Sequence, residues 1–284
     1  EKYPELKPLV DFVGEEELSV LHLVGFKAAK KAMDELGFER SSPKILALTD
    51  ADCVVDRNWL KNLIKGFTSK NIIATAGYCA TPDDVNFLQK MIGKELENRF
   101  KQFPKYISRA PTMNICVRTW VAKKVKMDEK LDVAFETDWG YRLTKYGKMK
   151  YVPEAKVCHY HRATLTSYFK QQLRYGMFVP LLYLKHKGKI TGDHISTPTM
   201  HLQLLLFALT TFFSFVSLFL PLQHLACAFF LSFLFSCLVD ILKITKNPIE
   251  VVFLLFLYFI RTVAWLIGGM LAIKKIISIK IHRF

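Results

Sequence analysis

The sequence predicts an α/β domain followed by a C-terminal region of transmembrane helices. Two observations support this fold class. Residues 18–80 alternate short apolar runs with segments of helical spacing, which is typical of a sheet covered by helices. Residues 201–273 are almost entirely apolar, whereas residues 1–200 carry most of the charge of the 284-residue chain. We therefore expect the main boundary near residue 200.

The α/β domain is expected to open with a strand at 18–24 and a helix at 26–36. A buried strand then covers 44–49, a short helix follows Asp56, and a further strand covers 72–78. This alternation predicts a parallel sheet with helices on its faces. Ligands bind such sheets at the carboxyl ends of the strands.

The triplet Asp50-Ala51-Asp52 stands at such a strand end. Two neighbouring carboxylates repel each other unless a cation lies between them. A hard divalent metal takes carboxylate oxygens and completes its shell with water and substrate phosphates. Asp50 and Asp52 are therefore candidate ligands of a metal that holds a diphosphate. The alternative is that both side chains only cap a helix or shape a turn.

A second group of polar residues begins with Glu136 and Asp138, just before a helical run at 139–147. A partly buried carboxylate with a raised pKa can act as a general base on a hydroxyl group. The alternative is that both carboxylates only favour the N-terminus of the helix through its dipole.

Short strands at 150–152 and 155–158 are followed by His159 and His161. A histidine here is either a third metal ligand or an ordinary polar residue at a strand end. An amphipathic helix from Thr164 then carries three further polar or aromatic candidates, Gln171, Arg174 and Tyr175. The guanidinium of Arg174 either holds a diphosphate or is simply solvated.

Three apolar segments, at 202–220, 225–242 and 251–273, are each long enough to cross a bilayer. With a cytosolic first domain, the basic loop at 243–246 is cytosolic too, as the positive-inside rule expects. Three full spans would then place the basic tail outside, against that rule, so one segment could instead be interfacial or re-entrant. Arg261 in the third segment is costly in lipid, and we expect it to face protein or to reach the interface.

The order of these motifs resembles that of the inverting family 2 glycosyltransferases of the GT-A fold, in the membrane-anchored branch that builds exopolysaccharides or glycolipids. The resemblance covers about residues 20–180 and rests on the following motifs in sequence order: DAD, TMN…R at 112–118, MDEKLDVAFETDWGYRL, KMKYVPEAKVCHYHR and QQLRYG. Together these are far more specific than any one motif.

The resemblance implies roles for particular residues. Asp50 and Asp52 would hold the metal, Mg²⁺ or Mn²⁺, and the donor diphosphate, with His159 as a further metal ligand. Glu136 would be the catalytic base, with Asp138 as the other acidic candidate; Phe135 stands where the family motif often has a leading Glu. The remaining binding residues for donor diphosphate and acceptor would be Thr112, Asn114, Gln171, Arg174 and Tyr175, where Tyr175 replaces the Trp of the family's QxxRW motif.

The resemblance also implies a domain order: a GT-A nucleotide-sugar domain at 1–163, an amphipathic interface helix and linker at 164–200, and transmembrane helices with a basic tail at 201–284. The family's first two strand-end turns, which contact the nucleotide, are not found in residues 1–24. We therefore expect an N-terminally truncated chain or, alternatively, one that has replaced this nucleotide pocket.

The expected function is metal-dependent, inverting transfer of a sugar from a nucleotide-diphosphate sugar to a lipid-linked or glycan acceptor. The site would be on the cytosolic face of a membrane, which we expect to be the plasma membrane of a prokaryote, with membrane lipids as partners. Six cysteines without metal-ligand spacing indicate reduced thiols in such a compartment. The alternative is a non-catalytic membrane scaffold with a degenerate transferase domain. The net charge of +15 alone suggests nucleic-acid binding, but no such motif is present and we expect none.

Overall fold

The computed structural model of the chain describes residues 18–23, 44–128, 131 and 133–281. It divides into two compact units. The first contains Glu1–Asp84 and Phe100–Tyr160, and the second contains Val85–Arg99 and His161–Phe284. The second unit thus includes a segment from within the predicted first domain, while the predicted boundaries at residues 163 and 200 stay predictions. The helix expected at 26–36 lies outside the described residues.

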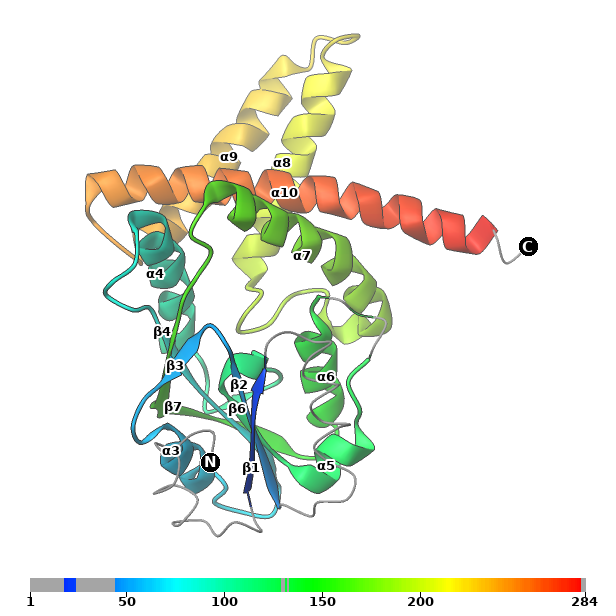
Figure 1. Ribbon diagram of the computed structural model, residues 1–284. Helices are drawn as coiled ribbons and strands as arrows, with labels where there is room; N and C mark the ends of the chain where they lie inside the picture. Colours follow the sequence, from blue (N-terminus) through cyan, green and yellow to red (C-terminus); the bar gives the residue numbers. More distant parts are fainter. Residues whose placement is uncertain (1–17, 24–43, 129–130, 132, 282–284) are drawn as a thin grey trace. The chain divides into compact units, whose positions relative to one another are not determined.

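Seven strands in the described part of the first unit form one sheet, with the order β1-β2-β6-β4-β7-β3 and with β5 paired to β7 (Figure 1). The strands are β1 (Leu18–Leu23), β2 (Ile45–Asp50), β3 (Cys53–Val55), β4 (Ile72–Ala80), β5 (Tyr106–Ile107), β6 (Ile115–Arg118) and β7 (Lys148–His159). The strands predicted at 18–24, 44–49 and 72–78 are confirmed as β1, β2 and β4.

The prediction of a parallel sheet is only partly confirmed, because the sheet is mixed: β6 is antiparallel to both of its neighbours, and β3 and β5 are antiparallel to β7. β1 and β2 are parallel, as are β4 and β7, but β6 lies between β2 and β4 and is antiparallel to both. The ICVR segment of β6 is short and three of its four residues are buried. Such a run fits a parallel or an antiparallel neighbour equally well, because local periodicity does not encode strand direction.

β7 is one long strand where the sequence predicts two short ones around Pro153. Its pairing with β4 shifts register between Gly77 and Tyr78, whose partners are Val152 and Lys156. A bulge at Pro153–Ala155 accommodates the proline, which has no N–H to donate to the ladder. A Cβ at Gly77 would collide with the Ala155 carbonyl, so a glycine is needed on the facing strand.

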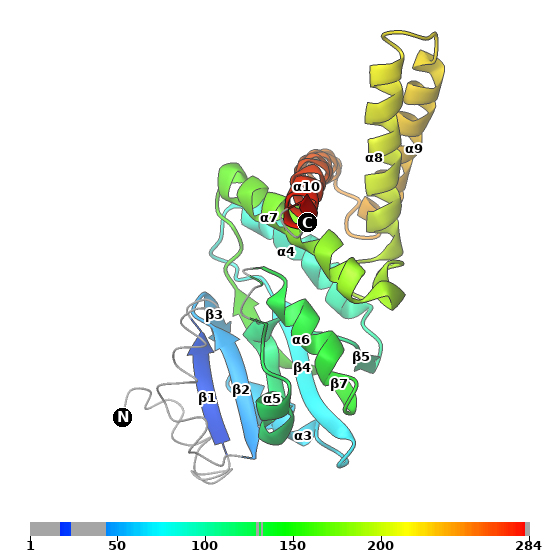
Figure 2. The ribbon, with the colours of Figure 1, turned by 90° about the vertical axis from the view of Figure 1, so that its right-hand side faces the viewer.

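The helices of the first unit lie on both faces of its sheet, with α3 on one side and α5 and α6 on the other (Figure 2). They are α3 (Trp59–Lys65), α5 (Thr119–Lys124) and α6 (Phe135–Leu143). The N–H of Asn58 donates to Asp56 Oδ1 at 2.9 Å, so Asp56 shapes the turn before α3. The first unit's core contains large side chains with almost no exposure, including Trp59, Leu46, Leu48, Ile115 and Met149.

Helix α6 begins earlier than the sequence predicts and includes Glu136 and Asp138 in its first turn. It ends at Leu143 rather than at Gly147. The residue before it, Ala134, has a φ of 62°, in the left-handed region that favours glycine. This backbone costs about 1–2 kcal/mol for a residue with a Cβ, and such costs are concentrated at functional sites.

The described part of the second unit is helical. Its elements are α4 (Phe87–Lys101), α7 (Leu165–Lys185), a short 3-10 turn η3 (Lys187–Lys189), α8 (Pro198–Val216), α9 (Gln223–Ile241) and α10 (Pro248–Ile281). Helix α4 belongs to the second unit as far as Arg99. The predicted helix start at Thr164 is confirmed, since Thr164 and Ser167 form a reciprocal capping box. Three helices, α8, α9 and the Pro248–Ile273 part of α10, are long and apolar enough to cross a membrane.

The fold class predicted from the sequence, a mixed α/β domain followed by a C-terminal helical region, is therefore confirmed. Of the two environments expected for Arg261, protein or the membrane interface, the structure confirms the first. Its side chain is buried in protein, where it donates to Glu95 Oε1 at 2.6 Å.

Candidate active site

The candidate site lies where β2 ends and turns into β3. Asp50 is the last residue of β2, and Ala51 and Asp52 form the turn before Cys53. β3 pairs antiparallel with the end of β7, with Cys53 opposite His159. The Tyr160 N–H also donates to the Asp52 carbonyl at 3.0 Å. Backbone pairing thus brings the DAD turn to the end of β7.

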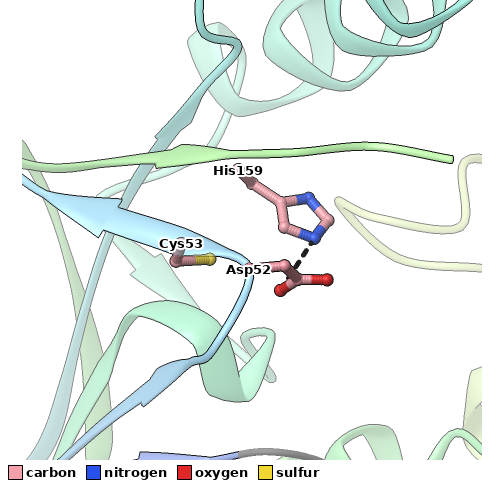
Figure 3. A group of neighbouring side chains, drawn as sticks. All are labelled: Asp52, Cys53 and His159. Carbon is pink, nitrogen blue, oxygen red and sulfur yellow. Dashed lines mark ion pairs between the residues drawn. The ribbon is translucent and has the colours of Figure 1, made fainter. Parts of the chain in front are cut away.

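Asp52 and His159 point toward each other in the resulting cluster (Figure 3). His159 Nε2 lies 3.4 Å from Asp52 Oδ1. The potential ligand atoms of Asp52, Cys53 and His159 all lie within 4.8 Å of one another. Asp52 is exposed and His159 is half-buried, so a ligand has access from solvent.

Asp50 belongs to the same electrostatic environment. Burial, and next the negative charge of Asp52, raise the pKa of the Asp50 carboxyl to about 6. Glu136 adds to this rise, while His159 and a hydrogen bond donated by the Thr112 side chain oppose it. The structure therefore brings together five of the residues predicted from the sequence: Asp50, Asp52, Thr112, Glu136 and His159.

The donor set of this cluster fits a hard or borderline divalent cation. Carboxylate oxygens suit Mg²⁺ and Mn²⁺, and an imidazole nitrogen is an acceptable additional ligand. Burial is the main cause of the raised pKa of Asp50 and the negative charge of Asp52 is the second, and a cation between the two carboxylates would oppose both effects. Burial and the nearby Asp50 and Asp52 raise the pKa of Cys53 to about 12. Its thiol thus stays protonated and is a poor ligand for such a cation.

Thr112 reaches Asp50 because of the register between β2 and β6. Leu48 pairs with Ile115, so the residues just before β6 lie beside the end of β2. Those residues form the 3-10 turn η2 (Thr112–Asn114), which is buried. Thr112 is therefore placed to orient the carboxylate of Asp50.

Asn114 has a different environment from the one that acceptor binding would require. Its side chain accepts from Trp59 Nε1 at 2.8 Å and donates to the carbonyls of Tyr78 and Ala155, both at 2.9 Å. Both donors of the amide are thereby used, and the residue is only 2% exposed. The described contacts of Asn114 join α3, β4 and β7 around the bulge.

Glu136 and Asp138 stand in different surroundings, although both lie in the first turn of α6. Glu136 is partly buried, and burial raises the pKa of its carboxyl, with Arg109 opposing the rise. Asp138 is fully buried, and its Oδ2 accepts from Arg142 Nε at 2.7 Å, one helical turn away. The two carboxylates therefore differ in exposure and in their partners.

Sequence reasoning missed two residues beside the site. Cys53 follows the DAD triplet directly, and a pairing of 53–55 with 157–159 would have identified it. Arg109 is buried, and its Nη1 donates to Thr137 Oγ1 at 2.7 Å. No local pattern in the sequence distinguishes Arg109 from the other basic residues of the chain.

Three further predicted residues, Gln171, Arg174 and Tyr175, belong to α7 in the second unit. Arg174 is exposed, and Gln171 and Tyr175 are half-buried. The neighbouring Gln172 is buried and accepts from Trp265 Nε1 at 3.0 Å on α10. That these three residues contribute to the site of the first unit stays a prediction.

No protein-family model and no curated protein matches the sequence. Among solved structures, the chain is similar to GalNAc-T7 with UDP, GalNAc and Mn²⁺, with a TM-score of 0.35 and 13% identity over 54% of this chain and 35% of that chain. It is also similar to the mannosyltransferase PcManGT from Pyrobaculum calidifontis in complex with GDP-Man and Mn²⁺, with a TM-score of 0.46 and 9% identity over 95% of this chain and 83% of that chain. Neither likeness assigns a role to a residue of this chain.

Proposed function

We propose that the protein is a membrane-attached glycosyltransferase of the GT-A type that transfers a sugar from a nucleotide-diphosphate sugar. The single observation that carries this proposal is the convergence of Asp50, Asp52, His159 and Glu136 at the carboxyl end of β2. In this proposal Asp50, Asp52 and His159 form the metal–diphosphate site, and Glu136, whose charge acts on Asp50, is the candidate base. Lipid-linked sugars and growing glycans are the acceptors that a membrane-attached site would take.

In this proposal Asp50, Asp52 and His159 hold the divalent cation, Mg²⁺ or Mn²⁺. When bound, the cation supplies positive charge that stabilises the leaving nucleoside diphosphate. Thr112 donates to Asp50 and holds that carboxylate in place. Cys53 contributes packing beside the ligands rather than a thiolate.

The proposed base is Glu136. Its raised pKa makes it a stronger proton acceptor than an ordinary carboxylate. Its negative charge also contributes to the raised pKa of Asp50. Glu136 takes the proton of the acceptor hydroxyl as the acceptor oxygen bonds to the anomeric carbon. The bond from that carbon to the diphosphate oxygen breaks, and its electron pair leaves with the nucleoside diphosphate. A single displacement of this kind inverts the anomeric carbon.

Asp138 is the second candidate for the base, but its ion pair with Arg142 and its full burial favour a structural role. Arg174, Gln171 and Tyr175 are proposed to complete the donor and acceptor site. Membrane attachment is proposed from the three long apolar helices, with the first unit on the cytosolic side.

The proposal is tested with the full chain in membranes, incubated with a panel of labelled nucleotide sugars and a lipid extract, with and without EDTA. We expect label to enter lipid or glycan from one donor, and expect this transfer to be lost with EDTA and in Asp52→Asn and Glu136→Gln. Folded protein that transfers from no donor in the panel would favour the non-catalytic scaffold. Transfer that survives EDTA would contradict the metal site.

A further inference from the structure

The apolar composition of α10 suggests a third membrane span, but the direction in which α10 runs in the second unit differs from that of α8 and α9. α8 and α9 lie side by side as a hairpin, whereas α10 runs across the hairpin rather than along it (Figures 1 and 2). Because all three helices belong to the same compact unit, their arrangement has consequences for the way the chain meets a bilayer.

A chain of polar contacts fixes where α10 crosses the hairpin. Arg261 Nη2 donates to Gln203 Oε1 at 3.0 Å, and Gln203 Nε2 donates to Asp240 Oδ2 at 3.1 Å. Gln203 is near the start of α8 and Asp240 near the end of α9, so both lie at the base of the hairpin, away from its turn at 217–222.

This contact is incompatible with α10 returning alongside the hairpin as a third antiparallel span. Arg261 lies 13 residues beyond Pro248, which corresponds to about 20 Å along a helix. If α10 ran back along α9, Arg261 would face the middle of the hairpin. It instead contacts the base, as a helix that crosses the base must.

The other partners of α10 are helices with charged exposed faces. Along its first half it meets α4, through Glu250 with Lys94 at 2.6 Å and Arg261 with Glu95 at 2.6 Å. Further along it packs on α7, where Gly176 and Gly268 allow the two backbones to approach closely. The exposed charged residues on these two partner helices include Lys90, Lys94, Lys170 and Arg174.

A spanning α10 would draw α4 and α7 into the hydrocarbon together with their charges. Exposed lysine and arginine side chains are strongly disfavoured there. Between Ile249 and Ile273, in contrast, the exposed large side chains on the outer face of α10 form an apolar stripe. Its exposed members are Ile249, Val252, Phe256, Phe259, Ile267, Met270, Leu271 and Ile273. Spacings of three, four and eight residues from Ile249 to Met270 place these side chains on one side of the helix, and Leu271 and Ile273 lie at the two edges of that side.

We infer that α10 does not cross the membrane but lies flat on it, with this apolar stripe against the lipid, while the α8–α9 hairpin inserts. The inference rests on the proposed membrane attachment. The opposite side of α10 packs against α4 and α7. A phospholipid surface is the occupant that matches a long apolar stripe beside helices with charged outer faces.

The inference removes the conflict with the positive-inside rule. A hairpin enters and returns on the same side, and a flat α10 adds no crossing. The basic residues at 243–246 and those at 274–283 of the sequence then lie on the side of the first unit, which the chain joins to α4 at Asp84–Val85 and Arg99–Phe100. Three spans would place the basic tail on the opposite side.

The first test compares the sidedness of two epitope tags in sealed vesicles treated with a membrane-impermeant protease. One tag follows Phe284, and the other is inserted between the exposed Asp83 and Asp84 of the first unit. We expect both tags to be cleaved, or both to be protected, in vesicles of either orientation. Cleavage of only one tag would mean an odd number of crossings and would overturn the inference. Release of the chain from the membrane by an alkaline carbonate wash would instead contradict membrane attachment itself.

The second test measures the depth of spin labels on the stripe, at Val252, Phe259 and Met270, in vesicles of phosphatidylcholine and phosphatidylglycerol. The accessible Cys158 and Cys227 are first replaced by alanine. From Val252 to Met270 a spanning helix would rise about 27 Å, almost the whole hydrocarbon thickness. A flat helix keeps all three labels at one shallow depth, about 5–10 Å into the bilayer boundary.

Labels at Leu231, Phe235 and Val239 on α9 provide the matched control, because their depths should change steadily along the hairpin. A steady change in label depth along α10 as well would overturn the inference. Labels on α10 that are inaccessible both to oxygen, which enters the lipid, and to a nickel chelate, which stays in water, would mean that protein covers the stripe. Such a cover, for example a second copy of this chain, would overturn the inference as well. Neither test depends on enzyme activity, so failure of the proposed transfer reaction would be seen separately.

Discussion

His159 Nε2 lies 3.4 Å from Asp52 Oδ1, and the two residues are separated by more than a hundred positions in the sequence. The contact exists because β3 pairs with the end of β7, with Cys53 opposite His159. An imidazole and a carboxylate at this separation can share a cation, whereas either alone would be a poor site.

The ligand set predicts which substitutions weaken metal binding. We expect His159→Gln and Asp52→Asn each to lower the affinity for Mn²⁺ by at least about tenfold. Removing a residue that only hydrogen-bonds to a metal ligand already lowers metal affinity by about this factor. Calorimetric titration of the purified chain with Mn²⁺ measures this effect without substrate. Cys53→Ser is the matched control and should bind Mn²⁺ as the wild type does. A large loss in Cys53→Ser would mean that the thiol ligates the metal.

The two acidic residues of α6 should respond in different ways to removal of their charge. Glu136→Gln should lower kcat by about 10²–10⁴-fold, the range for loss of a general base, with little change in melting temperature. Asp138→Asn should mainly reduce stability, by about 1.5–3 kcal/mol, because it weakens a buried charged hydrogen bond to Arg142. Steady-state kinetics and thermal unfolding of both variants separate the roles. A normal melting temperature with a lost kcat in Asp138→Asn would identify Asp138 as the base.

The raised pKa of Asp50 predicts a pH-dependent effect on stability in metal-free protein. A carboxyl with a folded-state pKa of about 6 and an ordinary value of 3.8 binds protons more tightly in the folded state. Its ionisation therefore destabilises the fold as pH rises from about 4 to 6, and the penalty persists above that range. With EDTA present, Asp50→Asn should be more stable than the wild type at pH 8, by about 1–3 kcal/mol.

The same comparison at pH 4 should show only a small difference, because pH 4 is close to the ordinary pKa of 3.8 and most of the destabilisation develops between that pH and about 6. Added Mn²⁺ at pH 8 should reverse the order, since only the wild type gains stability from the bound cation. Thermal unfolding under these three conditions measures the effect. A stability gain of Asp50→Asn that is equal at pH 4 and pH 8 would contradict the pKa of about 6.

Asn114 and Thr112 lie two residues apart and should also separate stability from ligand binding. Asn114→Ala removes three hydrogen bonds at the junction of α3, β4 and β7, and leaves buried partners unsatisfied. We expect a loss of stability of about 2–5 kcal/mol. Thr112→Val, which is nearly isosteric, should keep the fold and weaken Mn²⁺ binding through Asp50. Normal stability of Asn114→Ala would show that its amide is free to bind the acceptor.

Much of the site was predictable from the sequence because its strongest signals are local. The apolar run before Asp50 predicts both a buried strand and an acidic strand end, and β2 confirms this strand. Thr164 marks the start of α7 because a cap depends only on residues within one turn. Three apolar segments predict long helices by composition alone.

The remaining features depend on pairing, which local patterns do not encode. The antiparallel direction of β6 and the joining of Asp52 to His159 are set by strands distant in sequence. Ala134 in the left-handed region gives no sequence signal, because glycine is the residue normally expected there. Likewise, the apolar composition of α10 predicts a span, while its partners on α4 and α7 become visible only in the structure.

A metal–diphosphate site at the end of β2 is tested by calorimetric titration of the purified chain with a panel of nucleoside diphosphates, with Mn²⁺ and with EDTA. We expect one of these diphosphates to bind only with Mn²⁺, and we expect Asp52→Asn to lose this binding while Glu136→Gln keeps it. Binding that is equally tight in EDTA, or unchanged in Asp52→Asn, would contradict a metal–diphosphate site at the end of β2.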